Sequence, residues 1–314
     1  MKYKGSFMTK ELFTISTILI LFITFFFLPK KEIIDVPVIY QINGSNIENI
    51  ISNYRPKFLI IDYSKDGTEK FKFTSNDINI LKNKGITPLA YLSIGEAEDY
   101  RYYWKNEWYK NPPIWLYKEN PNWAGNYKVK YWHDDWKNII FNYLDKIIEQ
   151  GFSGVYLDLI DSYIFWSNNG YDITYTASEM IKFVIEIAEY ARKKNPVFLI
   201  VPQNGEDILD YDYNHKYLYT ISGIGIESLF YLYNKKNEDK YINSRLDYIL
   251  KIKSYGKFVL VTDYIYDPQK PNEEIILDFI KLCNYYDFYG YPANKNQKLK
   301  DLSGALKYFK EVKK

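Results

Sequence analysis

The sequence predicts an α/β protein of the (β/α)8 TIM-barrel class, on three observations. Eight short apolar runs recur along the chain, helix-like segments separate them, and several of those segments end at glycine. The runs are near-continuously apolar, which is typical of parallel strands covered on both faces. Repetition of helix, glycine and strand is typical of a βα array. Eight such units in roughly 280 residues fit the usual size of this barrel.

The predicted strands, in chain order, are residues 36–43, 57–64, 86–98, 151–161, 196–206, 221–230, 257–266 and 286–292. The helix-like segments between them are residues 45–54, 75–85, 135–151, 177–195, 237–256 and 272–286. Ser45 is expected to cap the first helix, and Gly85 and Gly151 to end the next two. A doubly wound open sheet is the alternative, but no G-x-G-x-x-G motif follows the first strand. We therefore expect one barrel domain over residues 36–314.

The first 31 residues are expected to be a separate segment. Leu12 to Leu28 contains seventeen residues without a charge, and lysines flank it on both sides. This pattern predicts a transmembrane signal anchor, or a signal peptide that is cleaved. We accordingly expect the protein at the cell membrane with the barrel outside, or secreted if the segment is removed.

Charge and motif content exclude several function classes. Without the first 31 residues the chain has 36 basic and 38 acidic residues and no basic stripe, so nucleic acid is not an expected partner. Cys283 lies in an apolar helical stretch and is expected to be a buried thiol. His133 and His215 lack metal-ligand spacing, so no metal or cofactor is expected; a carboxylate-only calcium or magnesium site is the alternative. G-x-S-x-G and phosphate-binding loops are absent.

Polar side chains stand near the exit of most predicted strands. They are Asp62, Glu96, Asp158, Asp161, Gln203, Asn204, Glu206, Glu227 and Asp263. In a barrel all strand exits lie on one face, where active sites are built. Crowded carboxylates repel one another and raise one another's pKa. Because this crowding is energetically unfavourable, it indicates a functional site. Glycoside hydrolysis needs such a pair, one acid to protonate the leaving oxygen and one carboxylate to attack or to activate water.

The distribution of tryptophan supports a sugar ligand. All seven tryptophans fall between residues 104 and 166. Flat C–H faces of sugar rings stack on aromatic rings, and cationic sugars add a cation–π attraction. We expect Trp104, Trp108 and Trp166 to contact the ligand, and Trp136, inside a predicted helix, to pack in the core.

The same segments resemble a known family. "VIYQIN", "FLIIDYS", "LAYLSIGEAEDYRYYW", "GFSGVYLDLIDSY", "VPQNGEDIL", "GIGIESLFY" and "VTDYIY" are similar, in order and spacing, to glycoside hydrolase family 114. The resemblance covers residues 36–292. It implies a barrel enzyme of the endo-α-1,4-polygalactosaminidase type, acting on a galactosamine-rich polysaccharide.

The resemblance also implies roles for individual residues. Asp158, at the end of the fourth strand, corresponds to the nucleophile, and Glu227, at the end of the sixth, to the acid/base. These strands are next-but-one neighbours, which suits the short carboxyl separation of a retaining enzyme. The remaining candidates would bind the sugar: Asp62, Tyr91, Glu96, Asp161, Gln203, Asn204, Asp263 and, more weakly, Glu206. A non-catalytic cell-surface barrel that binds glycan is the alternative function.

Overall fold

The computed structural model describes residues 32–312. They contain a compact unit that begins at Ile34. The predicted signal anchor or signal peptide, residues 1–31, lies outside the described residues. Within residues 32–312, no helix has the length and apolar character needed to cross a membrane.

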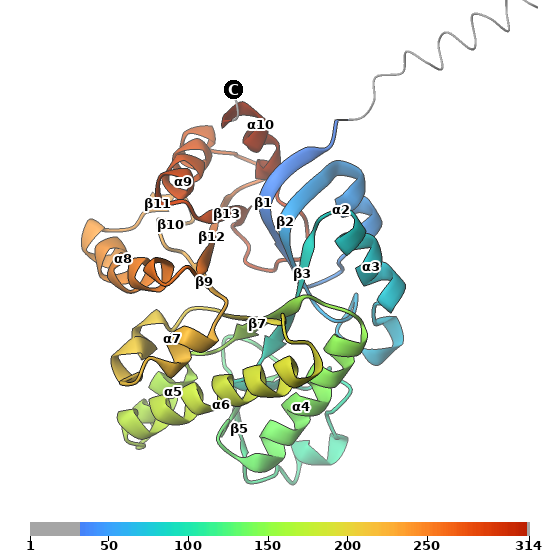
Figure 1. Ribbon diagram of the computed structural model, residues 1–314, viewed down its shortest axis with the longest axis vertical. Helices are drawn as coiled ribbons and strands as arrows, with labels where there is room; N and C mark the ends of the chain where they lie inside the picture. The colour runs from blue at the N-terminus through green and yellow to red at the C-terminus, as the bar shows by residue number, and fades with distance from the viewer. Residues whose placement is uncertain (1–31, 313–314) are drawn as a thin grey trace, which may run out of the picture. The chain divides into compact units, whose positions relative to one another are not determined.

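Eight parallel strands give the unit a TIM-barrel-like α/β fold, and they follow one another in chain order (Figure 1). Five pair in the order β1-β2-β3-β7-β8 and three in the order β9-β12-β13. A parallel bridge between Gln203 and Gly225 joins the two groups, and β13 lies beside β1. The strands are β1 (Ile34–Gln41), β2 (Tyr54–Ile61), β3 (Thr87–Ser93), β7 (Gly154–Asp158), β8 (Leu199–Pro202), β9 (Gly223–Glu227), β12 (Phe258–Tyr266) and β13 (Tyr289–Asn294). Each corresponds to one predicted run.

Helices cover the outside of the strands (Figure 1). They are α2 (Ile47–Asn53), α3 (Ser75–Asn83), α4 (Asp134–Glu149), α5 (Ser162–Asn168), α6 (Ile173–Lys194), α7 (Lys216–Thr220), α8 (Asp239–Ser254), α9 (Glu273–Tyr286) and α10 (Phe309–Val312). Short 3-10 turns are η1 (Glu69–Phe71), η2 (Asn106–Tyr109), η3 (Glu206–Tyr211) and η4 (Gly304–Tyr308).

The helix signals in the sequence are mostly confirmed. Gly85 and Gly151 follow α3 and α4 in the left-handed region, with φ of 76° and 88°, which glycine adopts without steric cost. The predicted cap Ser45 is wrong by one residue. Asn46 caps α2 by accepting the N–H of Asn49, while the Ser45 hydroxyl donates to the carbonyl of Gln41.

A small antiparallel sheet, which we call the insertion, follows β3. It consists of β4 (Glu96–Glu98), β5 (Leu116–Glu119) and β6 (Asn126–Val129), in the order β4-β6-β5. The predicted run 86–98 therefore contains two strands, because the chain leaves the barrel after Ser93 and joins a different sheet. A second hairpin, β10 (Tyr231–Leu232) and β11 (Lys235–Lys236), follows β9.

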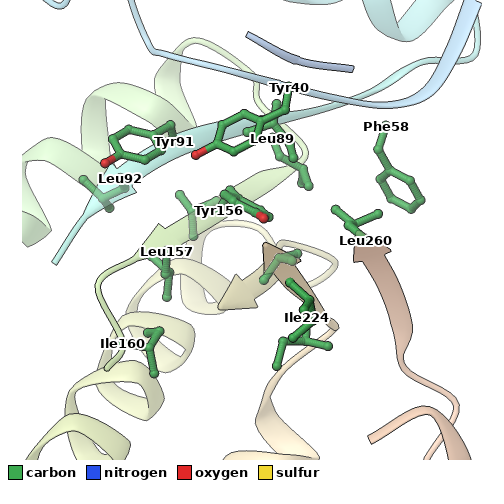
Figure 2. Close-up of a cluster of buried hydrophobic side chains, with 14 of the residues drawn as sticks. Tyr40, Phe58, Leu89, Tyr91, Leu92, Tyr156, Leu157, Ile160, Ile224 and Leu260 are labelled. Carbon is green, nitrogen blue, oxygen red and sulfur yellow. The ribbon is translucent and has the colours of Figure 1, made fainter. Parts of the chain in front are cut away.

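The barrel interior is filled by side chains that alternate inward along the strands. Figure 2 shows Tyr40 of β1 and Tyr156 of β7 pointing toward one another, with Phe58 and Leu260 beside them. The Tyr40 and Tyr156 rings meet edge to face, with centroids 5.2 Å apart. Both rings are almost fully buried. The interior is therefore a packed core, and a ligand can reach only its end.

Candidate active site

Asp158 and Glu227 occupy equivalent places at the ends of two strands. Asp158 is the last residue of β7 and Glu227 the last of β9, with β8 between them. Because the strands are parallel, both carboxyl groups lie at the carboxyl-terminal face of the barrel. The residue after each, Leu159 and Ser228, has a positive φ, of 67° and 51°. These turns end each strand abruptly, so both carboxylates lie at the rim of the core.

Two donors hold the Asp158 carboxylate. The Tyr91 hydroxyl, from β3, donates to Oδ2 at 2.6 Å, and the Leu159 N–H donates to Oδ1 at 2.8 Å. Burial, and after it the negative charge of Glu227, raise the pKa of Asp158 from 3.8 to about 7, although the Tyr91 hydrogen bond opposes the shift. The Glu227 carboxylate is therefore close enough to affect the ionisation of Asp158.

Glu227 is held by a larger set of side chains. The Tyr264 hydroxyl, from β12, donates to Oε1, and the Asn204 amide nitrogen donates to Oε2 at 3.1 Å. The Asn204 amide oxygen in turn accepts the Glu227 backbone N–H at 2.9 Å. Burial raises the pKa of Glu227, although the hydrogen bonds from Tyr264, Gln203 and Asn204 oppose the shift.

Two core tyrosines lie beneath the carboxylate pair. The Tyr40 hydroxyl donates to Gln203 Oε1 at 3.1 Å. Burial raises the pKa of both Tyr40 and Tyr156, and the charges of Asp158 and Glu227 add to the effect on each. Gly225 makes room for Tyr156, because a Cβ at this position would lie 1.9 Å from the Tyr156 hydroxyl oxygen.

An open cleft of about 560 Å³ leads away from Glu227. Its walls come from α5, from the segment between β8 and η3, and from one face of α8. They comprise Asp161, Ile164, Asn204, Gly205, Glu206, Asp207, Glu227, Tyr241, Ser244, Arg245 and Tyr248. A second cavity, of about 350 Å³, lies at the opposite end of the strands, where β1 and β13 begin. Only the first includes one of the paired carboxylates.

The family is decided by comparison with known proteins. The model for glycoside-hydrolase family GH114 matches residues 50–305. The chain belongs to this family. Family membership assigns the chain to the glycoside hydrolases.

Relatives of the chain include the uncharacterized protein MJ1477 of Methanocaldococcus jannaschii, which is 50% identical over 267 residues, 84% of this chain and 77% of that protein. An uncharacterized protein of Thermotoga maritima is 44% identical over 269 residues, 84% of this chain and 82% of that protein.

Two solved structures share the fold. The glycoside hydrolase domain of PelA from Pseudomonas aeruginosa has a TM-score of 0.63 at 13% identity and covers 86% of this chain and 98% of that chain. Aspergillus fumigatus Ega3, solved in complex with galactosamine, has a TM-score of 0.61 at 18% identity. The match covers 84% of this chain and 92% of the Ega3 chain.

Three acidic residues that were expected to bind substrate instead form ion pairs or hydrogen bonds with other groups of this protein. Asp62 is buried and paired with Arg101 at 2.6 Å. Glu96 is buried and paired with Lys128 at 2.6 Å, and two asparagine side chains also donate to it. Asp263 is fully buried and accepts three backbone N–H groups, from residues 229–231. These expectations are wrong because each carboxylate is already occupied inside the protein.

The expected tryptophan platforms are also largely enclosed. Trp166 is 1% exposed, and its indole N–H donates to the Val129 carbonyl at 2.9 Å. Trp108 is buried and meets Trp104 and Trp115 edge to face. We correct the expectation for Trp166 and Trp108, because neither has an open ring face. Trp104 is partly exposed, and its contact with a ligand stays a prediction.

The other expected residues lie around the carboxylate pair. Tyr91 and Asn204 contact the pair directly, Gln203 lies between Tyr40 and Glu227, and Asp161 lines the cleft. Glu206 lines the cleft as well, bound to Arg245.

Sequence reasoning missed four residues at this site. They are Tyr40, Tyr156, Tyr264 and Arg245. The three tyrosines lie within predicted strands, where a hydroxyl in an apolar run is the available signal. Arg245 lies in a helix, and no local sequence pattern marks it.

Among residues 32–312, no group of three or more His, Cys, Asp and Glu side chains is arranged to hold a metal ion.

Proposed function

We propose that this family 114 chain is a retaining α-glycoside hydrolase that cleaves an amino-sugar polysaccharide of the galactosamine type. The observation that carries the proposal is the pair Asp158 and Glu227, two partly buried carboxylates at the ends of next-but-one strands, with the charge of Glu227 raising the pKa of Asp158. Paired carboxylates of this kind perform glycoside hydrolysis, and burial keeps one of the two protonated near neutral pH.

In the proposed first step, the Asp158 carboxylate attacks the anomeric carbon and Glu227 gives its proton to the leaving oxygen. The glycosidic bond breaks and a sugar–Asp158 ester forms. In the second step Glu227 takes a proton from water, the water oxygen attacks the anomeric carbon, and the ester breaks. Both hydrogen bonds to Asp158, from Tyr91 and from the Leu159 N–H, favour its anionic form.

The galactosamine specificity is proposed from the charge of the cleft and from a protein that shares the fold. Asp161 and Asp207 bring carboxylates to the cleft, and a protonated amino sugar complements negative charge. Ega3, which shares the fold, was solved in complex with galactosamine. The proposed substrate is therefore a polymer whose sugars carry free amines.

The test is hydrolysis of a panel of amino-sugar polymers, measured as release of reducing ends. Asp158→Asn and Glu227→Gln are each expected to lower kcat by orders of magnitude while circular dichroism and Tm show that the fold survives. Proton NMR of the first product is expected to show the α-anomer, as retention requires. Full activity in either variant contradicts the assignment, and a β-anomer as first product contradicts the retaining mechanism. Binding of polymer without any product would instead identify a glycan-binding barrel.

A further inference from the structure

Arg245 connects helix α8 to the carboxylate pair. Its guanidinium binds both oxygens of Glu206, through Nε to Oε1 and through Nη2 to Oε2 at 3.0 Å. Nη1 donates to the Glu227 backbone carbonyl at 2.8 Å and to the Tyr241 hydroxyl at 2.9 Å. Nη2 also donates to the Asn204 amide oxygen at 3.3 Å. A guanidinium has five N–H groups, and these contacts account for all five.

These contacts determine which way the Asn204 amide faces. The amide oxygen accepts two donors, the Arg245 guanidinium and the Glu227 backbone N–H. Turning the amide over would set its NH2 group against both of them. The nitrogen is thus directed to Glu227 Oε2, at 3.1 Å.

The backbone at Asn204 adds to this constraint. Asn204 and the following Gly205 both adopt the left-handed region, with φ of 56° and 63°. A tight turn at this point brings the Asn204 side chain back over the end of β9. Glu206, the first residue of η3, directly follows this turn and is ion-paired with Arg245. The ion pair therefore ties the end of the turn to α8.

We propose that Arg245 is a positioning residue for Glu227, fixing the Asn204 amide and the end of β9 so that the Glu227 carboxyl is held toward Asp158. This inference rests on the proposed function, in which Glu227 is the acid/base. Arg245 lines the cleft, but all its N–H groups are used within the protein and its charge is matched by Glu206. Direct binding of a cationic sugar by Arg245 is therefore disfavoured.

The experiment compares two substrates that differ in their need for an acid. One is an α-1,4-linked galactosamine oligomer, whose leaving alkoxide must be protonated. The other is a galactosaminide with a dinitrophenolate leaving group, which departs without protonation. The value of kcat/KM reports the first bond-breaking step for both.

The variants separate positioning from folding. Arg245→Lys keeps the charge and loses the five-donor fork. Arg245→Met is combined with Glu206→Gln, so that no buried carboxylate is left unpaired. Arg192→Lys is the matched control, because Arg192 also bridges the β8 and β9 region, at the strand starts, through the Phe198 carbonyl and the Ser222 hydroxyl.

We expect both Arg245 variants to lower kcat/KM about 10- to 100-fold on the oligomer and by less than about 3-fold on the activated substrate, the same selective loss that is expected of Glu227→Gln. Arg192→Lys should lower Tm without this difference between substrates. Equal losses on both substrates, or a rise in KM alone, would overturn the inference while leaving the proposed function intact.

A crystal structure of the double variant gives a readout that needs no activity. We expect the Asn204 amide or the Glu227 carboxyl to change orientation. Unchanged Asn204–Glu227 hydrogen bonds would overturn the positioning role. If the wild type cleaves neither substrate but the variant structure shows the reorientation, the positioning role stands and the proposed function fails.

Discussion

The two central carboxylates differ in how the chain holds them. Asp158 accepts one hydroxyl and one backbone N–H, whereas Glu227 accepts from Tyr264 and Asn204. All of these donors favour the ionised form, and burial favours the protonated form of both. A change in one donor therefore shifts the pKa of the carboxyl that it contacts.

Replacing Asp158 by Asn should stabilise the fold at neutral pH. Burial raises the folded-state pKa of Asp158 from 3.8 to about 7, so the folded state binds more protons than the unfolded state in this window. Its contribution to stability is fully present below about pH 4 and is lost as pH rises through about 7. At pH 8 the variant should gain about 1 kcal/mol or more, which raises Tm by about 2–4 °C.

Thermal unfolding at pH 4 and pH 8 checks this prediction. The gain should be largest at pH 8 and much smaller at pH 4, where the carboxyl is neutral in the folded state and only partly ionised in the unfolded state. A variant that is less stable than the wild type at pH 8 would contradict the argument.

Two tyrosine variants should move opposite limbs of the pH–rate profile. Tyr91→Phe removes a donor to the Asp158 carboxylate, so the pKa of Asp158 rises and the acidic limb of kcat/KM moves to higher pH. Tyr264→Phe removes a donor to Glu227, so Glu227 stays protonated to higher pH and the alkaline limb moves up. Profiles measured on the same galactosamine oligomer distinguish the two. Movement of the same limb in both variants would contradict the assigned roles.

At the scale of single residues, the sequence predicted the carboxylates better than their surroundings. Asp158 and Glu227 end apolar runs, and both lie at the site. Asp263 ends a similar run but accepts backbone N–H groups of residues 229–231, more than 30 positions away. Sequence cannot separate these cases, because the partner that occupies a carboxylate is distant along the chain.

At the scale of elements, Asp263 organises the loop that follows β9. Its oxygens accept the N–H groups of Leu229, Phe230 and Tyr231 at 2.8–3.0 Å. These are the residues that lead from Glu227 into β10. A single side chain of β12 thus fixes the path of the chain directly after the candidate acid/base.

Asp263→Ala should therefore destabilise the fold strongly. Three backbone donors would lose their acceptor in a buried site, at about 1–3 kcal/mol each, so we expect a total loss of about 3 kcal/mol or more. Urea unfolding should show a lower midpoint. Glu274→Ala, at the exposed start of α9, is the control and should change the midpoint little. A near-neutral Asp263→Ala would contradict the structural role.

The tryptophans belong to the packing of the insertion against the helices. Trp166 of α5 donates to Val129 of β6, and its ring lies 5.3 Å from that of Trp132. Trp136 of α4 donates to the Ile94 carbonyl, between β3 and β4. The clustering of tryptophan in one segment thus reflects the packing of the insertion onto the barrel, in the same hydrophobic core as the strands.

Trp166→Ala should cost about 3–5 kcal/mol of folding free energy, because it empties a fully buried site. Trp123→Ala, at a position that is 53% exposed, is the matched control and should cost much less. Chemical unfolding of both variants measures the difference. Equal and small effects would show that the packing of the insertion does not depend on Trp166.

At the scale of the whole molecule, the apolar runs predicted the order of the strands well. All eight runs became parallel strands in chain order, because a strand that is buried on both faces leaves a continuous apolar run. The insertion was missed, since β4 continues the run of β3 without a break in composition. The positions of Arg245 and of the tyrosine hydroxyls depend on helix placement and side-chain packing, which no short pattern records.

Strand order also explains how residues 158 and 227 come together. Each βα unit advances the chain by one strand, so β7 and β9 are separated only by β8, although almost 70 residues lie between the two carboxylates. The register of β9 against β8 is fixed by the bridge between Gln203 and Gly225 and by the Asn204 N–H, which donates to the Gly225 carbonyl at 2.8 Å. A shift in this register would move Glu227 relative to Asp158.

The contact of Tyr156 with Gly225 couples the evolutionary histories of these two positions. Because even a methyl group on residue 225 would lie 1.9 Å from the phenolic oxygen, no lineage can enlarge residue 225 and retain tyrosine at 156 without displacing the tyrosine ring or a strand. A substitution of residue 225 should therefore persist only when a second substitution at residue 156 compensates for it. Among descendants of a common ancestor, the glycine and the tyrosine should be inherited, and lost, together.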